Sequence, residues 1–250
     1  MGTGVNPDAY REMAATEDQH WWFAGRRAVL ASVLQTMRLT PAARILEIGA
    51  GSGGNLGLLA RFGQVTGLEM DMEACALAKS KAPSVDVRLG VFPADDLLSG
   101  ERYDLVCMLD VLEHMDDDVA ALAASRSILA PGGRLLLTVP AHPWLWSGHD
   151  VFLHHKRRYT RRALRRAASS AGFRVEKCSA LNCLLYPLLI AVRCWGRLRG
   201  GLPAGGAMPP APLNALLRWI FSLERKAVAG WGLPFGASLL AVLRPASGND

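Results

Sequence analysis

The stretch ILEIGAGSGGN, residues 45–55, contains residues whose types and spacing suit cofactor binding. An apolar run leads into a turn with Gly49, Gly51 and Gly53, and glycines allow a tight turn and let a ligand approach the backbone closely. The turn also fits the G-x-G-x-x-G pattern, so it suits a dinucleotide as well as another nucleoside cofactor. Glu69 follows the glycine turn at the sequence spacing typical of a carboxylate that accepts hydrogen bonds from both ribose hydroxyls of a bound nucleoside. A carboxylate in this place disfavours a ligand with a 2′-phosphate.

Four histidines gather in residues 140–160, PAHPWLWSGHDVFLHHKRRYT, a stretch that is long for a connection between two elements. Histidine is the side chain most often used as a general acid or base. We expect His149 or His154 to act as a general base, with Asp150 as its orienting partner. His114 is expected either to act in the site or to shape the pocket. The alternative for the histidines of this stretch is that they order the loop through hydrogen bonds.

Buried strands alternating with helices must position these residues. Short apolar runs separated by helical stretches occupy residues 44–49, 64–70, 85–90, 103–109 and 134–140. Such runs indicate strands that are buried on both faces, and therefore a parallel sheet in a doubly wound α/β domain. A helix is expected over residues 18–38 and others near 53–62, and two more strands over 174–181 and 237–244.

Four motifs in order resemble those of class I S-adenosylmethionine-dependent methyltransferases. They are EIGAGSG from Glu47, GLEMD at the second strand, YDLVCMLDVLEH at the fourth and LAPGGRLLLTVP at the fifth. The resemblance covers roughly residues 20–180 plus the last strand. DVLEH and PGG have no counterpart in the dinucleotide pattern, so S-adenosylmethionine is the expected cofactor. The resemblance implies a seven-stranded, mostly parallel sheet in the order 3-2-1-4-5-7-6, with the last strand antiparallel.

The resemblance also implies which residues hold the cofactor: Glu47, Gly49, Ala50, Gly51, Gly53, Glu69, Asp95, Asp96 and Asp110. Glu47 and the glycine turn would hold the methionine end, beside Asp110, and Glu69 would hold the ribose. Asp95 or Asp96 would meet the adenine amino group. The residue after the glycine that closes the third strand is valine, where many relatives have aspartate. No metal ligand set is expected.

Composition and charge limit the remaining possibilities. The chain has 250 residues, half of them hydrophobic, which is enough for one large core or a core with a small appendage. Residues 1–155 carry a net charge of −7 and residues 156–250 a net charge of +13. This asymmetry predicts that the second half of the chain binds an anionic partner. The five cysteines are scattered without a CxxC pair, and no signal peptide is recognised, so a cytoplasmic protein is expected.

Residues 182–235 are expected to form a helical apolar insertion, because they separate the last two strands. The methyltransferase domain then comprises residues 1–181 and 236–250, with a helical lid over residues 1–40 that includes the aromatic stretch HWWF. The insertion begins with an apolar run, but only 15 uncharged residues lie between Lys177 and Arg193. As a helix these cover about 22 Å, against about 30 Å for a hydrocarbon core. The run is therefore too short to span a bilayer.

A second segment of the insertion, residues 213–228, has the pattern of an amphipathic helix. One face is predicted to carry Leu213, Leu216, Leu217, Ile220, Leu223 and Ala227. The two helices are expected to close over the substrate cleft and to attach peripherally to anionic lipid, with Trp195 and Trp219 at the interface. Packing of the helices into the core is the alternative.

The expected function is methyl transfer to a lipophilic small molecule, most readily at oxygen. A quinone or phenolic precursor, a prenyl lipid or a polyketide-like compound would fit the apolar insertion. Three alternatives stay open at this stage: a nucleic-acid base methyltransferase, a non-catalytic cofactor-binding scaffold at a membrane, and an oxidoreductase with the same glycine turn. No NPPY-type sequence follows the fourth strand and no nucleic-acid module is recognised, so nucleic acid is not the expected partner.

Overall fold

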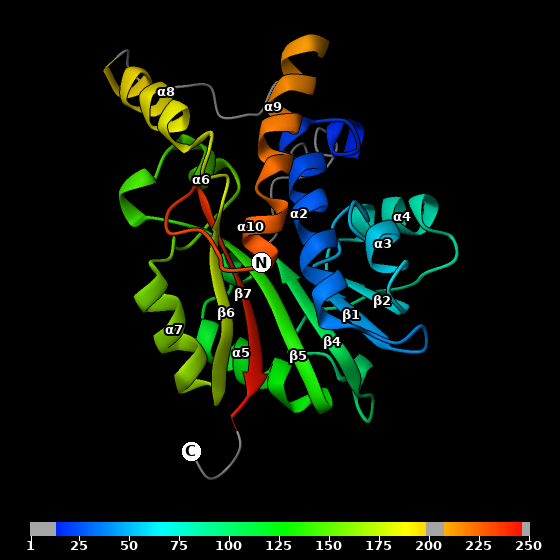
Figure 1. Ribbon diagram of the computed structural model, residues 1–250. Coiled ribbons are helices and arrows are strands. Elements are labelled where there is room, and N and C mark those ends of the chain that lie inside the picture. Colours follow the sequence, from blue (N-terminus) through cyan, green and yellow to red (C-terminus); the bar gives the residue numbers. More distant parts are fainter. Residues whose placement is uncertain (1–13, 199–207, 247–250) are drawn as a thin grey trace.

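A single mixed sheet forms the centre of the computed structural model, which describes residues 14–198 and 208–246 (Figure 1). The strand order is β3-β2-β1-β4-β5-β7-β6, and β7 runs antiparallel to both of its neighbours. The predicted topology is therefore confirmed. The strands are β1 Arg44–Ile48, β2 Gln64–Glu69, β3 Asp86–Leu89, β4 Tyr103–Leu109, β5 Leu129–Pro140, β6 Phe173–Leu181 and β7 Ser238–Pro245.

Helices cover both faces of the sheet because consecutive side chains of each central strand point to opposite sides. In β1, Ile45 packs with α2 (Trp21–Met37) and α4 (Met72–Lys81). The next residue, Leu46, packs with α5 (Asp118–Ser127) and α7 (Arg161–Ser170). Both cores are continuous and fully buried. This two-sided burial explains why the strands read as uninterrupted apolar runs.

Two expected boundaries differ from the structure. The helix expected near residues 53–62 is only α3 (Leu56–Leu59), because the glycine turn extends to its start. The strand expected over residues 134–140 begins earlier, at Leu129, so that β5 also includes the segment APGG. Leu129 pairs with Tyr103 there, and the register then shifts before Arg134 pairs with Leu105.

The insertion contains α8 (Tyr186–Leu198), α9 (Ala211–Leu223) and α10 (Arg225–Ala229). α9 and α10 pack along α2, whereas α8 extends away from the sheet beyond its carboxyl edge (Figure 1). Part of the Gly/Pro-rich linker between α8 and α9 lies outside the described residues. Among the residues described, no helix has both the length and the apolar character needed to cross a bilayer.

The predicted apolar face of α9 is divided by the structure. Leu217 and Ile220 pack against the core, but Leu213, Leu216 and Leu223 are exposed. The helix is anchored instead by Phe221, which is fully buried against Trp21 and Trp22 of α2. Asn214 fastens the outer part of the helix, since its side chain accepts a hydrogen bond from the Trp21 amide at 2.8 Å. The prediction of one apolar face was therefore wrong, because it left Phe221 out.

Candidate active site

A cavity of about 910 Å³ lies at the carboxyl ends of β1, β2, β4 and β5. Ligands of open α/β sheets bind at this edge, where loops converge. The cavity wall combines the glycine turn, the first turns of α2, the loop after β5 and residues of α8. Residues far apart in the sequence therefore meet in one space, which is large enough for two ligands of moderate size.

The glycine turn has the backbone conformation that its composition predicts. Gly49, Gly51 and Gly53 have φ values of +70°, +54° and +87°, which other residues adopt rarely. A Cβ on Gly49 would lie 2.6 Å from Val111, whereas one on Gly51 would meet nothing within 4 Å. Gly49, Ala50 and Gly51 line the cavity. Gly53 does not, and it lets the turn pack against the backbone of α4 instead.

Glu69 is fixed at the cavity wall by the backbone. Its two carboxylate oxygens accept hydrogen bonds from the amides of Gly51 at 2.8 Å and Asp71 at 2.9 Å. Burial raises the pKa of Glu69, and these hydrogen bonds act in the opposite direction. The carboxylate thus ties the end of β2 to the glycine turn, in the place where a ribose-binding acceptor is predicted.

Glu47 is buried beneath the glycine turn and does not line the cavity. Its Oε1 accepts a hydrogen bond at 2.9 Å from Asn55, which does line the cavity. Its Oε2 has no hydrogen-bond partner among the described residues, and burial raises the pKa of Glu47 to about 8. Direct contact with a ligand is therefore not supported for Glu47, which instead contacts the wall through Asn55.

Asp95, one of the two aspartates predicted to meet adenine, is not among the residues that line the cavity. Asp95 accepts a hydrogen bond at 2.7 Å from the amide of Val91 and thereby closes its own turn. The wall here is made by Gly90, Val91, Phe92 and Pro93. The adenine role of Asp95 therefore stays a prediction, and the side chain of Asp96 lies outside the part of the chain that the structure describes.

Asp110 ends β4 with a φ of +60° and places its carboxylate in the cavity wall. It accepts a hydrogen bond from Thr138 at 2.9 Å and forms an ion pair with Arg26 of α2. Burial lowers the pKa of Arg26 to about 10, which still leaves it charged at neutral pH. Arg26 was not predicted from the sequence, because only the aromatic residues of the stretch HWWFAGRR were expected in the site.

The N-terminal segment closes one side of the cavity. Trp21, Trp22 and Phe23 all contribute to the wall. The buried carboxylate of Glu17 holds the segment down, because it accepts hydrogen bonds at 2.7 Å from Ser52 of the glycine turn and from Lys81 of α4. Glu17 was also missed, since nothing in its local sequence marks it.

Two of the three predicted histidines line the cavity, but His154 does not. His114 and His149 are on the wall, and burial lowers the pKa of each to about 4, which keeps them neutral at physiological pH. His154 has a φ of +56° and is exposed away from the wall. Its neighbour His155 occupies the wall instead.

Asp150 orients His155 rather than the two histidines predicted as bases. Its Oδ1 lies 2.9 Å from Nδ1 of His155, and its two oxygens accept hydrogen bonds from Arg158 at 2.7 and 3.0 Å. Burial alone would raise the pKa of Asp150, but the hydrogen bonds from His155 and Arg158 outweigh it and hold that pKa well below its usual range. The expected pairing of Asp150 with His149 or His154 was therefore wrong.

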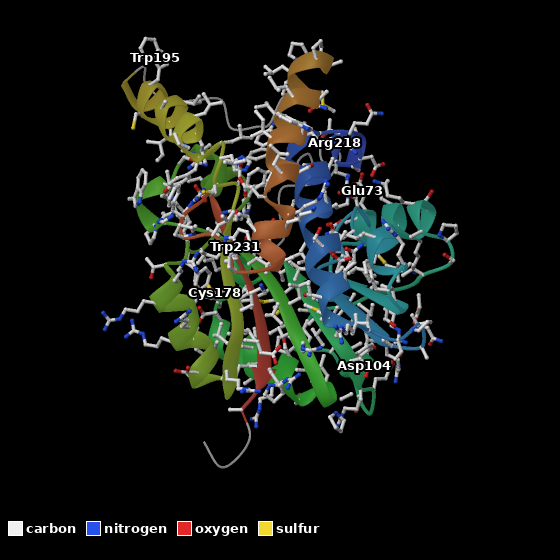
Figure 2. All side chains as sticks on the ribbon, viewed as in Figure 1. Glu73, Asp104, Cys178, Trp195, Arg218 and Trp231 are labelled. Atoms are coloured by element: carbon white, nitrogen blue, oxygen red, sulfur yellow. The ribbon has the colours of Figure 1, made fainter. Side chains whose placement is uncertain are left out.

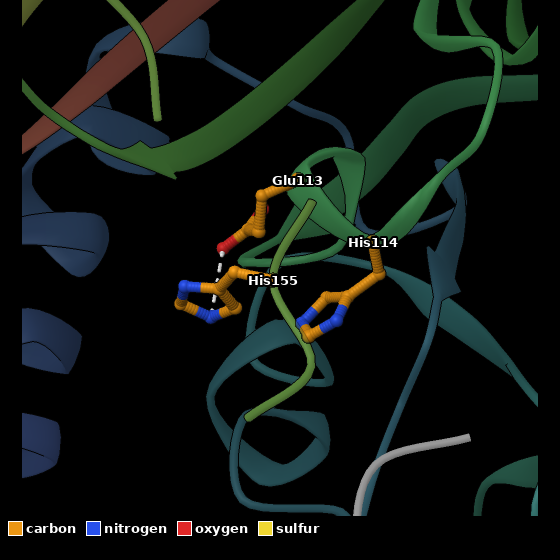
Figure 3. A group of neighbouring side chains, drawn as sticks. All are labelled: Glu113, His114 and His155. Atoms are coloured by element: carbon orange, nitrogen blue, oxygen red, sulfur yellow. Dashed lines mark ion pairs between the residues drawn. The ribbon is translucent and has the colours of Figure 1, made fainter. Parts of the chain in front are cut away.

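Glu113, His114 and His155 form a cluster (Figure 3). One nitrogen or oxygen atom from each of the three lies within 4.8 Å of those from the other two. Glu113 is completely buried, and neither carboxylate oxygen has a hydrogen-bond partner among the described residues. Burial raises its pKa to about 8, although Arg26 and Arg158 act to lower it.

The comparisons with known proteins agree with this geometry. A family model described as a methyltransferase domain matches residues 22–177. A ubiquinone biosynthesis O-methyltransferase of Xanthomonas campestris is 33% identical over 131 residues, covering 47% of this chain and 55% of that protein. A probable S-adenosylmethionine-dependent methyltransferase of Mycolicibacterium smegmatis is 29% identical, covering 66% and 64%. The chain thus spans only about half the length of the first of these relatives.

A solved structure shares the fold along almost the whole chain. It is a SAM-dependent methyltransferase from Thiobacillus denitrificans in complex with S-adenosyl-L-homocysteine, with a TM-score of 0.58 and 18% identity, covering 97% of this chain and 99% of that one. The predicted cofactor, S-adenosylmethionine, is confirmed at the level of the family. The chain belongs to the methyltransferase-domain family and has the fold of class I S-adenosylmethionine-dependent methyltransferases.

Proposed function

We propose that the protein transfers the methyl group of S-adenosylmethionine to a hydroxyl group of a lipophilic small molecule. The observation that carries this proposal is the cavity of about 910 Å³, whose wall has two parts of different chemistry. One wall consists of the glycine turn and fixed charged groups. The other consists largely of apolar side chains from α8 and from the N-terminal aromatic stretch.

The charged wall suits a nucleoside joined to an amino acid. Glu69 presents a carboxylate fixed by two backbone amides, which fits ribose hydroxyls. Asp110 and Arg26 place a negative and a positive charge side by side, which fits an ammonium and a carboxylate on one carbon. Gly51 leaves open space where a side chain would stand. These groups would hold the cofactor, with Glu47 supporting them through Asn55.

The apolar wall suits a lipophilic methyl acceptor. Leu185, Leu188, Leu189 and Val192 of the α8 region line the cavity together with Trp22. Leu188 and Val192 are also exposed to solvent, so the apolar surface continues from the cavity to the outside. Oxygen is the proposed acceptor atom because neutral histidines line the same space, and because similar proteins are named as ubiquinone biosynthesis O-methyltransferases.

The protein's task in such a transfer is alignment. The cofactor supplies a methyl group already activated on a sulfonium, so the residues need to place the acceptor in line with it and to exclude water. The α2 and α8 walls exclude water, and the charged wall fixes the direction of the methyl group.

Methyl transfer is tested with radiolabelled S-adenosylmethionine and an alkyl-substituted hydroquinone as the acceptor probe. We expect the label on oxygen in an organic-extractable product, and far less transfer to an unsubstituted, water-soluble phenol. Label appearing on added RNA instead would contradict the proposal and favour a nucleic-acid base as the acceptor.

We also propose that the α8 and α9 surface attaches the protein to anionic lipid. Large apolar side chains are exposed on both helices, including Leu188, Trp195, Leu216 and Trp219. Trp195 projects from the far end of α8, away from the sheet (Figure 2). Basic residues nearby, among them Arg218, would add attraction to anionic headgroups.

Vesicle flotation tests this attachment. We expect binding to vesicles that contain phosphatidylglycerol, release by high salt, and little binding to neutral phosphatidylcholine. A protein that binds neither vesicle would contradict the proposal, and binding that survives alkaline carbonate would mean deeper insertion than proposed.

A further inference from the structure

A buried ion pair fixes the orientation of His155. Asp150 is 0% exposed, and it also accepts a hydrogen bond at 2.8 Å from the amide of Ser147. With Arg158 on both of its oxygens, Asp150 is held as an anion. An anionic carboxylate accepts only, so Nδ1 of His155 must carry the proton in the hydrogen bond between them. In the neutral ring, Nε2 is then left with a free lone pair.

The other side of the ring faces a carboxyl group that lacks a partner. Nε2 of His155 lies 3.9 Å from Oε1 of Glu113, which is too long for a hydrogen bond (Figure 3). Both residues line the cavity. A buried carboxyl group without a partner costs free energy, so this pair of atoms fits a hydroxyl group that contacts Glu113 and His155 at once.

The backbone keeps the two groups together. The amide of Lys156 donates to the carbonyl of Glu113 at 2.9 Å, and the amide of His155 donates to the carbonyl of Asp150 at the same distance. Within the described residues, neither His114 nor His149 is hydrogen-bonded to a carboxylate. Among the described histidines of the wall, His155 is therefore the one whose Nδ1 is held by a carboxylate.

We propose that His155 is the general base of the reaction, that Asp150 is its positioning residue and that Glu113 binds the acceptor hydroxyl. This inference rests on the proposed function. The acceptor oxygen forms a bond to the methyl carbon while the carbon–sulfur bond breaks, and the electron pair of that bond stays on sulfur. The hydroxyl proton passes to Nε2 of His155 and later leaves to water. The imidazolium formed is stabilised by Asp150.

Kinetics of His155→Gln test the role of the base. We expect a fall in methyl transfer to the alkylhydroquinone of about 10²- to 10⁴-fold, the usual effect of losing a general base, with unchanged affinity for S-adenosylhomocysteine. The loss should be much smaller with a nitrophenol probe, which ionises without help. His154→Gln is the matched control and should behave as wild type. An equal loss with both probes would overturn the proposal, because it would indicate a structural role.

Two further measurements test the role of His155. Nitrogen-15 NMR of the wild-type protein with S-adenosylhomocysteine, followed over pH, should show that the neutral form of the His155 ring carries its proton on Nδ1, and a neutral ring with its proton on Nε2 would overturn the proposal. The NMR measurement needs no methyl acceptor, so it tests the role of His155 even if no probe is methylated. Failure to methylate any probe would count only against the proposed function. Activity that is lost with a chelator and restored by a divalent cation would also overturn it, since the cluster would then hold a metal.

Discussion

The glycine-turn side of the cavity and the insertion side are built in different ways. The glycine-turn side depends on hydrogen bonds donated by backbone amides, such as that from Gly51 to the Glu69 carboxylate. It also depends on the burial of short strands on both faces of the sheet. The insertion side depends on a few large side chains, above all Phe221, while many of its apolar residues stay exposed. The first region is a fixed frame for a ligand, and the second has surface left for a partner.

The insertion side is expected to be most sensitive to substitution of Phe221. The side chain is fully buried between α9 and the aromatic residues of α2. We expect Phe221→Ala to lower the free energy of unfolding by about 3–5 kcal/mol, the usual cost of removing a buried phenylalanine. Urea denaturation followed by circular dichroism measures it. A cost below 1 kcal/mol would mean that α9 is not docked on α2.

On the glycine-turn side, Glu69→Ala should weaken binding of S-adenosylhomocysteine by roughly 1–3 kcal/mol, the scale of hydrogen bonds to a charged group. The matched control is Asp95→Ala, which removes an exposed carboxylate that lies off the cavity wall. We expect that variant to bind almost as wild type. If Asp95→Ala weakened binding as much as Glu69→Ala, the adenine role predicted for Asp95 would be supported.

Glu47 should make the stability of the folded protein depend on pH. Its pKa is about 8 in the folded protein, well above the ordinary value of 4.5, so the folded state binds the proton more tightly. Its contribution to stability is present below about pH 4.5 and is lost as the pH rises through about 8, with a slope of at most about 1.4 kcal/mol per pH unit. Glu47→Gln should therefore gain stability relative to wild type between pH 5 and 8, as unfolding curves would show. A constant difference would contradict the raised pKa.

The smallest effect is expected at Trp219, which is on α9 like Phe221 but is 60% exposed. Trp219→Ala should change the free energy of unfolding by less than about 0.5 kcal/mol. The same variant should bind phosphatidylglycerol vesicles more weakly than wild type. Loss of stability comparable to that of Phe221→Ala would show that the outer face of α9 belongs to the core.

Local patterns predicted most of the frame but not the pairings across the cavity. The strands, their order and the turn from Gly49 to Gly53 follow from apolar runs, glycines and the resemblance. The pair of Arg26 with Asp110 joins residues 84 positions apart, so no spacing rule could find it. The choice of His155 over His154 depends on a left-handed backbone at His154, which the sequence HH does not reveal.

The burial of single side chains was also beyond the sequence. Phe221 and Trp219 both look apolar, and only the position of α2 decides which of them is covered. Glu113 follows the fourth strand in a motif that the resemblance includes, but its lack of a partner appears only once the neighbouring segments are in place.

Titration calorimetry of the wild-type protein tests the central claim most directly. The fixed carboxylate of Glu69, the Asp110–Arg26 pair and the open space at Gly51 should bind S-adenosylhomocysteine tightly at one site per chain, whereas NAD should give little or no heat. Tight binding of NAD with no response to S-adenosylhomocysteine or S-adenosylmethionine would contradict the account and would place the cavity among dinucleotide-binding sites.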